Sequence, residues 1–426
     1  MVDVWLPYGE TEVCLRVSAR SLIETLTSRE AEGVEDPRIE VEKALDEPIG
    51  TGKLKEIAKS RERAAIIIKN STEVDAQLNR IALECILGEL SEAGIRAQNI
   101  RVLVGYDPLT TSREAGIEAL TRDGGLGGVE ISIHDPSVDG DHVEAGRTRS
   151  GTRLRINRAY MEADLKISVG FVELHPYAGY GGGREAILPG ISDLKAVRSN
   201  QALALNPRAR MGLLDGNPVH EDMVEAAEPV GVDFALNMAR NSLGRVVGAS
   251  SGSLDESFME CVRLLDGMYR VEVERRADVV FWSPGGSPHD SNLYRASLGL
   301  SNALTLLKRD GILVLVAECL DGYGDEAFYK AMAEFRDSRR LERSLRRRFT
   351  AGGYVAYRLM KVMEMAEVLL VSALPDYYAL DVFRLKTHRT VNEALRYALD
   401  RAGRNSKVTA VVSGNTVIPA PSRDES

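Results

Sequence analysis

Ala163-Asp-Leu-Lys-Ile-Ser-Val-Gly170 is followed by His175-Pro-Tyr-Ala-Gly-Tyr-Gly-Gly-Gly-Arg-Glu-Ala-Ile-Leu-Pro-Gly190. The first stretch predicts a buried strand, and the second predicts a loop at the end of that strand. Three consecutive glycines, Gly181 to Gly183, allow a ligand to approach closely or the backbone to adopt dihedrals that a Cβ forbids. Peptide N–H groups in such a loop can cradle an anion. We therefore place the candidate active site here, with a tight structural turn as the alternative.

Charged and titratable side chains flank the three glycines. His175 supplies a base, Arg184 a cation and Glu185 a carboxylate. A histidine ordinarily titrates near neutral pH, so it can exchange protons with a substrate. The loop thus combines groups that hold an anionic ligand with a group that transfers protons.

The chain before this loop alternates between strand and helix patterns. The run Ala64-Ala-Ile-Ile-Ile-Lys69 is typical of a strand that is buried on both faces of a parallel sheet. The same rhythm continues with a helix over 75–92, a strand over 100–104, a helix over 112–120 and a strand over 129–134. This order predicts an α/β fold with a mostly parallel sheet.

Polar residues follow each of these predicted strands. Ligands of open parallel sheets bind beyond the carboxyl ends of the strands. The residues at those ends are Asn70 to Glu73, Asp107, His134 and His175. We therefore expect them to face a common site, although the case for His134 is weaker.

The length of 426 residues predicts two domains. A second series of strands and helices opens with Ala277-Asp-Val-Val-Phe-Trp282, so we place the domains at 1–270 and 271–426. A short helix is predicted over 21–28 and a long one over 292–308. An active-site cleft is expected between the domains, lined by residues 70–73, 105–111, 175–185 and 285–295.

Composition narrows the class of protein. The net charge of −9 argues against nucleic acid as the main partner, and the arginine-rich segment 339–349 is interpreted as a solvated helix face. The four cysteines are scattered without a C-x-x-C motif, which fits a reducing cytoplasm. The N-terminus does not read as a signal peptide, and no apolar run is long enough for a membrane helix. A small-molecule ligand is therefore the expected partner, and the oligomeric state is left open.

Ordered landmarks along most of the chain point to one family. They are Tyr8-Gly9, Pro48-Ile-Gly50, Ala163-Asp164, Gly170, His175-Pro-Tyr-Ala-Gly-Tyr-Gly-Gly-Gly183, Leu188-Pro-Gly190, Gly216-Asn-Pro218, Asp233-Phe234 with Asn237, and Gly285-Gly-Ser-Pro-His-Asp-Ser-Asn-Leu-Tyr294. This set resembles the nickel-dependent lactate racemase family, whose members are 2-hydroxyacid racemases and epimerases. The resemblance implies two α/β domains with the active site in the cleft between them.

The resemblance also assigns roles to positions, and most positions differ here. Active members use a nickel-pincer nucleotide tethered to a lysine, a histidine on nickel, and two further histidines that exchange protons. One of these two is retained as His175, while the other corresponds to Asp107. The tethering lysine corresponds to Glu185 and the nickel histidine to Gln201. The arginine of an Asp-x-Thr-Arg motif corresponds to Glu73.

These replacements change the expected chemistry. Glu185 cannot form the lysine linkage, and Gln201 is a poor nickel ligand beside imidazole, so a covalent nickel-pincer nucleotide is not expected. A divalent cation such as Mg or Mn, held by His175 with Glu185, Gln201 or Asp107, is an alternative. Asp107 could act as a general base if burial raises its pKa.

The remaining candidates form a site for an anionic ligand. The amides of Gly181 to Gly183, with Arg184 or Arg295, are expected to hold the anionic group, together with Thr72 and Tyr294. Arg295 could replace the carboxylate-binding cation that is lost at position 73.

The favoured function is that of an isomerase-like enzyme which acts on a small 2-hydroxy acid or sugar acid without the tethered nucleotide. The alternatives are a non-catalytic ligand-binding or regulatory protein and a metal-dependent enzyme of another reaction type.

Overall fold

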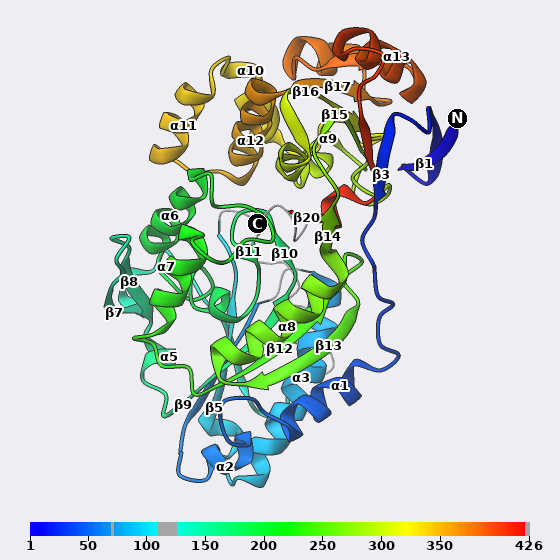
Figure 1. Ribbon diagram of the computed structural model, residues 1–426. Helices are drawn as coiled ribbons and strands as arrows, with labels where there is room; N and C mark the ends of the chain where they lie inside the picture. Colours follow the sequence, from blue (N-terminus) through cyan, green and yellow to red (C-terminus); the bar gives the residue numbers. More distant parts are fainter. Residues whose placement is uncertain (70–71, 109–125, 422–426) are drawn as a thin grey trace. The chain divides into compact units, whose positions relative to one another are not determined.

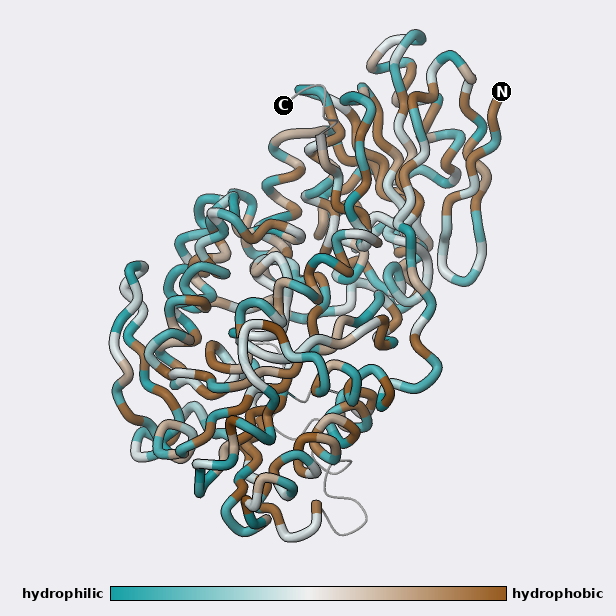
Figure 2. Tube along the Cα trace, turned by 60° about the horizontal axis from the view of Figure 1, so that its bottom comes forward, coloured by the Kyte–Doolittle hydropathy of each residue, from teal (hydrophilic) through white to brown (hydrophobic). Residues whose placement is uncertain are grey.

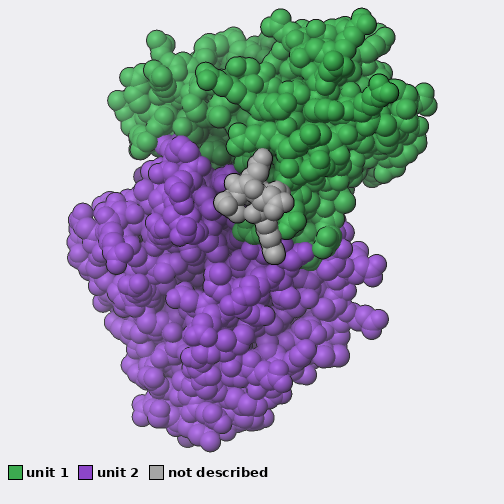
Figure 3. Space-filling model, viewed as in Figure 1, with its two compact units in different colours: residues 1–29, 268–426 green, residues 30–267 purple. Residues whose placement is uncertain are grey.

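The structure, a computed structural model, describes residues 1–69, 72–108 and 126–421. It divides into two compact units, of which unit 1 combines Met1–Arg29 with Met268–Ser426 and unit 2 is Glu30–Gly267. Figure 3 shows the two units in separate colours. The helix predicted over 112–120 lies outside the described residues.

Unit 2 is built on a six-stranded sheet in the order β13-β12-β9-β4-β5-β6. All of its pairs are parallel except that of β12 with β13. The strands, drawn in Figure 1, are β4 (Ala64–Lys69), β5 (Ile100–Gly105), β6 (Glu130–Ile133), β9 (Leu165–Val172), β12 (Phe234–Arg240) and β13 (Val246–Gly252). The prediction of an α/β fold with a mostly parallel sheet is therefore confirmed.

Strand β4 is buried on both faces because side chains alternate along a strand. Ile66 and Ile68 join a core cluster that includes Ile86. Ala65 and Ile67 face the opposite cluster. Each fully buried isoleucine contributes about 2 kcal/mol relative to an exposed one. The first cluster takes residues from α1 (Pro37–Asp46) and α3 (Glu73–Glu92), and the second takes residues from α5 (Arg158–Met161) and α7 (Pro218–Ala227).

Shorter elements complete unit 2 and carry the glycine loop. They are α2 (Leu54–Ala58), β7 (His142–Arg147), β8 (Arg153–Asn157), β10 (Leu174–His175), β11 (Gly179–Tyr180), η4 (Gly183–Ala186), α6 (Leu194–Ala202) and α8 (Leu254–Tyr269). Strands β10 and β11 pair antiparallel, with His175 opposite Gly179. The predicted loop after β9 is thus a tight hairpin that runs into a short 3-10 turn.

Unit 1 contains a second six-stranded sheet, entirely parallel, in the order β18-β17-β16-β15-β19-β3. Its strands are β3 (Leu22–Leu26), β15 (Ala277–Trp282), β16 (Leu307–Val316), β17 (Glu367–Val371), β18 (Lys386–His388) and β19 (Val408–Val411). The hairpin of β1 (Val2–Tyr8) and β2 (Thr11–Val17) packs on its core. Its helices are α9 (Leu293–Ala296), α10 (Glu326–Glu334), α11 (Ser338–Arg347), α12 (Ala351–Met365) and α13 (Val391–Ala402), and β14 (Arg270–Val273) pairs with β20 (Ile418–Pro421).

Hydrophobic positions follow the sheet strands in the trace of Figure 2. Among the described residues, no helix combines the length and apolar character needed to cross a bilayer.

Two predicted helices are wrong. Leu22–Leu26 is strand β3, because it adds to the edge of the unit 1 sheet beside β19. The first 29 residues therefore group with the C-terminal segment, which differs from the predicted division at 270, although the chain changes unit at Met268. The predicted helix over 292–308 is interrupted because the Gly299 amide donates to Asn415 Oδ1 (3.1 Å), and β16 already begins at Leu307.

Candidate active site at the carboxyl edge of the unit 2 sheet

Parallel pairing places the ends of three strands at one edge of the unit 2 sheet. Lys69 at the end of β4 lies opposite Gly105 at the end of β5, and β9 runs parallel to β4 on its other side. Asp107 follows β5, and His175 follows β9. The sheet thus brings Lys69, Asp107 and the glycine loop to the same edge.

The centre of this edge is an ion pair between Lys69 and Glu185. Lys69 Nζ lies 2.5 Å from Glu185 Oε1, and the Gly182 amide donates to Glu185 Oε2 at 2.8 Å. Burial favours the neutral form of Glu185, but Lys69, His175 and these hydrogen bonds outweigh it and lower the pKa of Glu185 to about 2. Burial likewise disfavours the charge of Lys69, yet Glu185 raises the pKa of Lys69 above its ordinary value. Both groups are therefore charged at neutral pH.

The amides of the glycine loop are already engaged within the protein. Gly181 donates to the Glu173 carbonyl (2.8 Å), Gly182 to the Glu185 carboxylate and Gly183 to Asn237 Oδ1 (3.0 Å). The predicted anion cradle is thus occupied by a carboxylate of the chain itself. This internal use was not expected from the sequence.

The glycines are required by backbone geometry. Gly182 has a φ of +86°, and a Cβ there would lie 2.7 Å from the Phe171 carbonyl oxygen. Gly183 has a φ of +53°, and its Cβ would approach Phe258 at 3.1 Å. Both positions favour glycine because other residues rarely adopt positive φ. Tight packing therefore accounts for these two glycines without a bound ligand.

Arg184 is buried inside the loop, which differs from its predicted role at a ligand. Its guanidinium donates to the carbonyls of Gly182 (3.2 Å) and Tyr180 (2.8 Å) and lies 4.1 Å from the centroid of the Phe258 ring. Burial lowers the pKa of Arg184 to about 10. Arg184 therefore fixes the shape of the loop.

His175 accepts hydrogen bonds on one ring nitrogen. Its Nδ1 faces the amides of Tyr177 (3.4 Å) and Ala178 (3.1 Å), and its ring packs edge-to-face on Tyr177 at 4.4 Å between centroids. Burial lowers the pKa of His175 to about 4, so the expected titration near neutral pH is not supported. The neutral ring consequently carries its proton on Nε2.

Asp107 and Gln201 form a second buried contact at this edge. Gln201, from α6, donates through Nε2 to Asp107 Oδ2 at 2.6 Å, and both side chains are buried. Gln201 Oε1 is buried and finds no hydrogen-bond partner in the described part of the chain. Within residues 1–69, 72–108 and 126–421, no group of three His, Cys, Asp or Glu side chains could hold a metal ion. Glu185 and Gln201 each bind another residue, and the metal site predicted at His175, Glu185 and Gln201 stays a prediction.

His134 has a structural role at the end of β6. Its Nε2 lies 3.0 Å from the Ser192 carbonyl oxygen, and its Nδ1 lies 3.3 Å from Asn157 Nδ2. Burial lowers the pKa of His134 to about 4. Both ring nitrogens are thus engaged by neighbouring groups.

Thr72 caps α3. Its Oγ1 accepts from the Asp75 amide, and its own amide donates to Asp75 Oδ2, both at 3.1 Å. Its hydroxyl therefore has a local role. Asn70 and Ser71 lie outside the described residues.

The candidates in the second half of the chain, Tyr294 and Arg295, belong to α9 in unit 1. Tyr294 packs edge-to-face against Phe328 at 5.9 Å, and burial raises its pKa to about 12. Arg295 is exposed. The expectation that they share a cleft with the glycine loop stays a prediction.

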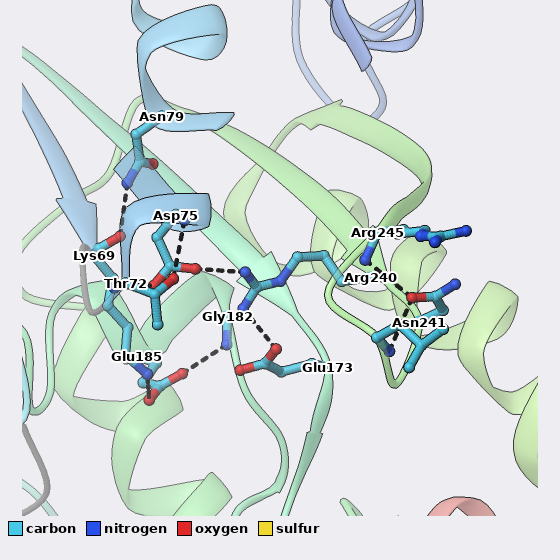
Figure 4. Close-up of polar contacts among 11 residues, drawn as sticks. Lys69, Thr72, Asp75, Asn79, Glu173, Gly182, Glu185, Arg240, Asn241 and Arg245 are labelled. Carbon is cyan, nitrogen blue, oxygen red and sulfur yellow. Dashed lines mark hydrogen bonds and ion pairs between the residues drawn. The ribbon is translucent and has the colours of Figure 1, made fainter. Parts of the chain in front are cut away.

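Two cations at this edge were not predicted from the sequence. Lys69 closes the apolar run of β4, and this polar end of a buried strand was an available signal. Arg240 ends β12 and contacts Asp75 and Glu173; Figure 4 shows both cations with their carboxylates. No local pattern marks Arg240, because its partners are far away in the sequence.

Comparisons with known proteins agree with this architecture. The lactate racemase N-terminal domain family matches residues 8–212, and the lactate racemase C-terminal domain family matches residues 272–419. The lactate racemase of Thermoanaerobacterium thermosaccharolyticum is 29% identical over 98% of this chain and 99% of its own. That of Lactiplantibacillus plantarum is 29% identical over 98% of this chain and 100% of its own.

Solved structures give the same result for the fold. The structure of the lactate racemase apoprotein from Thermoanaerobacterium thermosaccharolyticum superposes with a TM-score of 0.84 at 26% identity, covering 98% of this chain and all of that one. A Thermotoga maritima protein matches with a TM-score of 0.55 at 15% identity, over 87% of this chain and 97% of its own, which concerns the fold alone.

Proposed function

The chain belongs to the lactate racemase family, and from this premise we propose that it acts on a small 2-hydroxy acid or sugar acid without a covalently tethered nickel-pincer nucleotide. The substrate class follows from the relatives, which are lactate racemases. The proposal rests on Glu185, which corresponds to the tethering lysine of the family and whose carboxylate already binds Lys69 and the Gly182 amide.

Glu185 does not fit a tether. A carboxylate cannot form the lysine linkage, and both of its oxygens are engaged, by Lys69 and by the Gly182 amide. At the nickel position, Gln201 donates to Asp107 instead of offering an imidazole. The residues present therefore do not match the family's cofactor.

Lys69 is the best candidate to bind the anionic group of a ligand. An ammonium has three N–H donors, and Glu185 engages one of them. The Lys69 side chain is 26% exposed, so a ligand can reach it. Its raised pKa keeps it charged. This assignment replaces the predicted role of Arg184.

Asp107 and His175 would supply the proton chemistry. The Asp107 carboxylate is the candidate base, and Gln201 fixes its orientation. Because Nδ1 of His175 accepts two amide protons, its Nε2–H can donate to a ligand oxygen. A base and a donor of this kind suit proton exchange at a carbon next to a carboxylate.

A second candidate function is a non-catalytic ligand-binding protein. It is favoured by the glycine loop, whose amides are all engaged within the chain and so are not ready to stabilise a developing negative charge.

The cofactor claim is tested by intact mass after co-expression with the enzymes that make the nickel-pincer nucleotide. The lactate racemase of Thermoanaerobacterium thermosaccharolyticum serves as the positive control in the same host. We expect this chain at its unmodified mass. An adduct of nucleotide size would refute the proposal.

The substrate claim is tested by thermal shift with lactate, gluconate and neutral glycerol, since a ligand that prefers the folded state raises the melting temperature. Lys69→Gln should remove the shift. Lys55→Gln is the matched control, because Lys55 pairs with Glu92 at an exposed position. Solvent exchange of the α-proton in D2O then separates the two functions, since a binding protein gives a shift but no exchange.

A further inference from the structure

Arg240 is held between two carboxylates at the site edge. Its Nη1 lies 2.5 Å from Asp75 Oδ1, and its Nη2 lies 2.6 Å from Glu173 Oε2. Figure 4 shows the guanidinium between these two side chains, and Arg240 ends β12 at the same edge of the sheet as Lys69 at the end of β4. Asp75 belongs to α3, Arg240 ends β12, and Glu173 lies between β9 and β10.

The two carboxylates differ in how firmly they are fixed. The Asp75 side chain is 6% exposed, and its other oxygen accepts the Thr72 amide in the cap of α3. The Glu173 side chain is 43% exposed. Asp75 is therefore a built-in counterion, whereas Glu173 can leave Arg240 for solvent at low cost.

One edge of the Arg240 guanidinium is incompletely used. Nε and Nη2 form a single edge that fits both oxygens of a carboxylate. Glu173 engages Nη2, while Nε is buried and has no hydrogen-bond partner among the residues that the structure describes. Arg240 is 8% exposed, and an unpaired buried donor costs about 1–3 kcal/mol. A carboxylate that met both nitrogens would remove this defect.

We propose that Glu173 is an internal substitute for a ligand carboxylate, and that the Nε and Nη2 edge of Arg240 binds such a group once Glu173 swings into solvent. The Phe171 ring, 4.2 Å from the guanidinium, holds it in place for this exchange. For the identity of the natural ligand, this inference rests on the proposed function. The exchange itself concerns any small carboxylate.

The position of Glu173 connects the exchange to the rest of the site. Its carbonyl accepts the Gly181 amide, and it lies two residues before His175. Its charge also contributes to the raised pKa of Lys69. A ligand carboxylate on Arg240 would thus lie beside the glycine loop and within the field of Lys69.

The alternative is a permanent structural ion cluster, in which Glu173 never leaves. Buried ion pairs often serve fold specificity alone. The two hypotheses differ in one measurable respect, because only an exchangeable Glu173 competes with added carboxylate for Arg240.

The test is a titration of the melting temperature with sodium acetate at constant ionic strength, chloride being the replaced anion. Glu173→Gln should lower the half-saturating acetate concentration by about tenfold relative to wild type, because the competing charge is gone while the edge remains. Glu173→Ala should act in the same direction. Glu130→Gln is the matched control. Glu130 is an exposed glutamate whose Oε2 lies 2.7 Å from Arg101 Nη2, at the opposite edge of the sheet, and the substitution removes its charge.

Arg240→Lys in the Glu173→Gln background should abolish the gain, because an ammonium keeps the charge beside Asp75 but lacks the forked edge. The inference is overturned if Glu173→Gln stays within about twofold of wild type, or if the gain survives Arg240→Lys. Should that double variant fail to fold, the two Glu173 titrations decide alone.

Parallel titrations with lactate and gluconate separate this inference from the proposed function. If Glu173→Gln gains acetate affinity but no hydroxy acid shifts any form of the protein, the exchange stands and the proposed function fails. If wild type responds to lactate and Glu173→Gln gains nothing with either acid, the proposed function stands and the exchange is refuted.

Discussion

Both units carry a glycine-rich loop beyond the carboxyl ends of a parallel sheet, and the two loops use their carboxylates differently. In unit 1, the loop after β15 contains Asp290, whose Oδ2 accepts the amides of Gly9 (2.8 Å) and Glu318 (3.0 Å). In unit 2, Glu185 accepts one amide and pairs with Lys69 from another strand. The first carboxylate holds backbone together, while the second also neutralises a cation.

This difference separates a structural loop from a candidate site. Fixing backbone amides requires only an acceptor, and a neutral side chain could provide one. A partly buried ion pair is costly to assemble and often contributes little net stability. The presence of two such cations at the unit 2 edge, Lys69 and Arg240, therefore favours a role in binding. If the two loops differ in this way, substitutions in each loop should affect stability and ligand binding differently.

Lys69→Met should have the largest effect. It leaves the Glu185 carboxylate, which is 6% exposed, without its cation, and breaking a buried pair in this way costs about 4 kcal/mol. Glu185→Gln in the same chain should restore most of the loss, since a glutamine oxygen can still accept the Gly182 amide. Urea unfolding of the two single variants and the double variant measures the coupling. Additive losses would show that the pair is not an energetic unit.

Acid should destabilise the protein through Glu185. Its folded pKa of about 2 lies below the ordinary value of 4.5, so its stabilising contribution is complete above about pH 5 and is lost as the pH falls towards 2. The contribution is about 3 kcal/mol. Comparing urea unfolding of wild type and Glu185→Gln at pH 6 and pH 3 isolates it, because the other titrating groups are shared. Equal acid sensitivity of the two proteins would contradict the depressed pKa.

Asp290→Ala should cost about 2 kcal/mol, because the buried Gly9 amide and the partly buried Glu318 amide lose their acceptor. Any thermal shift with lactate or gluconate should persist in whatever folds. Asp321→Ala, which alters an exposed residue in the same unit, should be nearly neutral. Loss of the ligand response in Asp290→Ala, with stability intact, would reverse the roles assigned to the two loops.

The contrast between the loops shows what the sequence could predict. The β-branched run at 64–69 correctly predicted a central strand, because such a pattern depends only on adjacent residues. Asp107 and His175 each follow a strand, and they were correctly placed at one edge of the sheet because the strands are parallel. The loop amides were expected to face a ligand, but Glu185 engages one of them. Its contact with Lys69 joins residues 116 apart in the chain, and no local pattern encodes it.

The same reason explains the errors in unit 1. The segment 21–28 has a composition that suits a short helix in isolation, but pairing of β3 with β19 decides its structure. The helix over 292–308 fails because Asn415, far along the chain, captures the Gly299 amide. Long-range hydrogen bonds override local propensity in both cases.

His175→Asn should have the smallest effect on stability and a complete effect on the ligand response. An asparagine oxygen can replace Nδ1 as the acceptor for the Tyr177 and Ala178 amides, so we expect a loss below about 1 kcal/mol. The substitution removes Nε2–H, which is the group assigned to the ligand. His175→Ala, by contrast, should lose both the ligand response and about 1–2 kcal/mol, because the two amides lose their acceptor. Because burial lowers the pKa of His175 to about 4, the wild-type ligand response should not change with pH between 6 and 8. If His175→Asn keeps the full response to lactate and gluconate, the histidine is a structural part of the loop, as Asp290 is in unit 1.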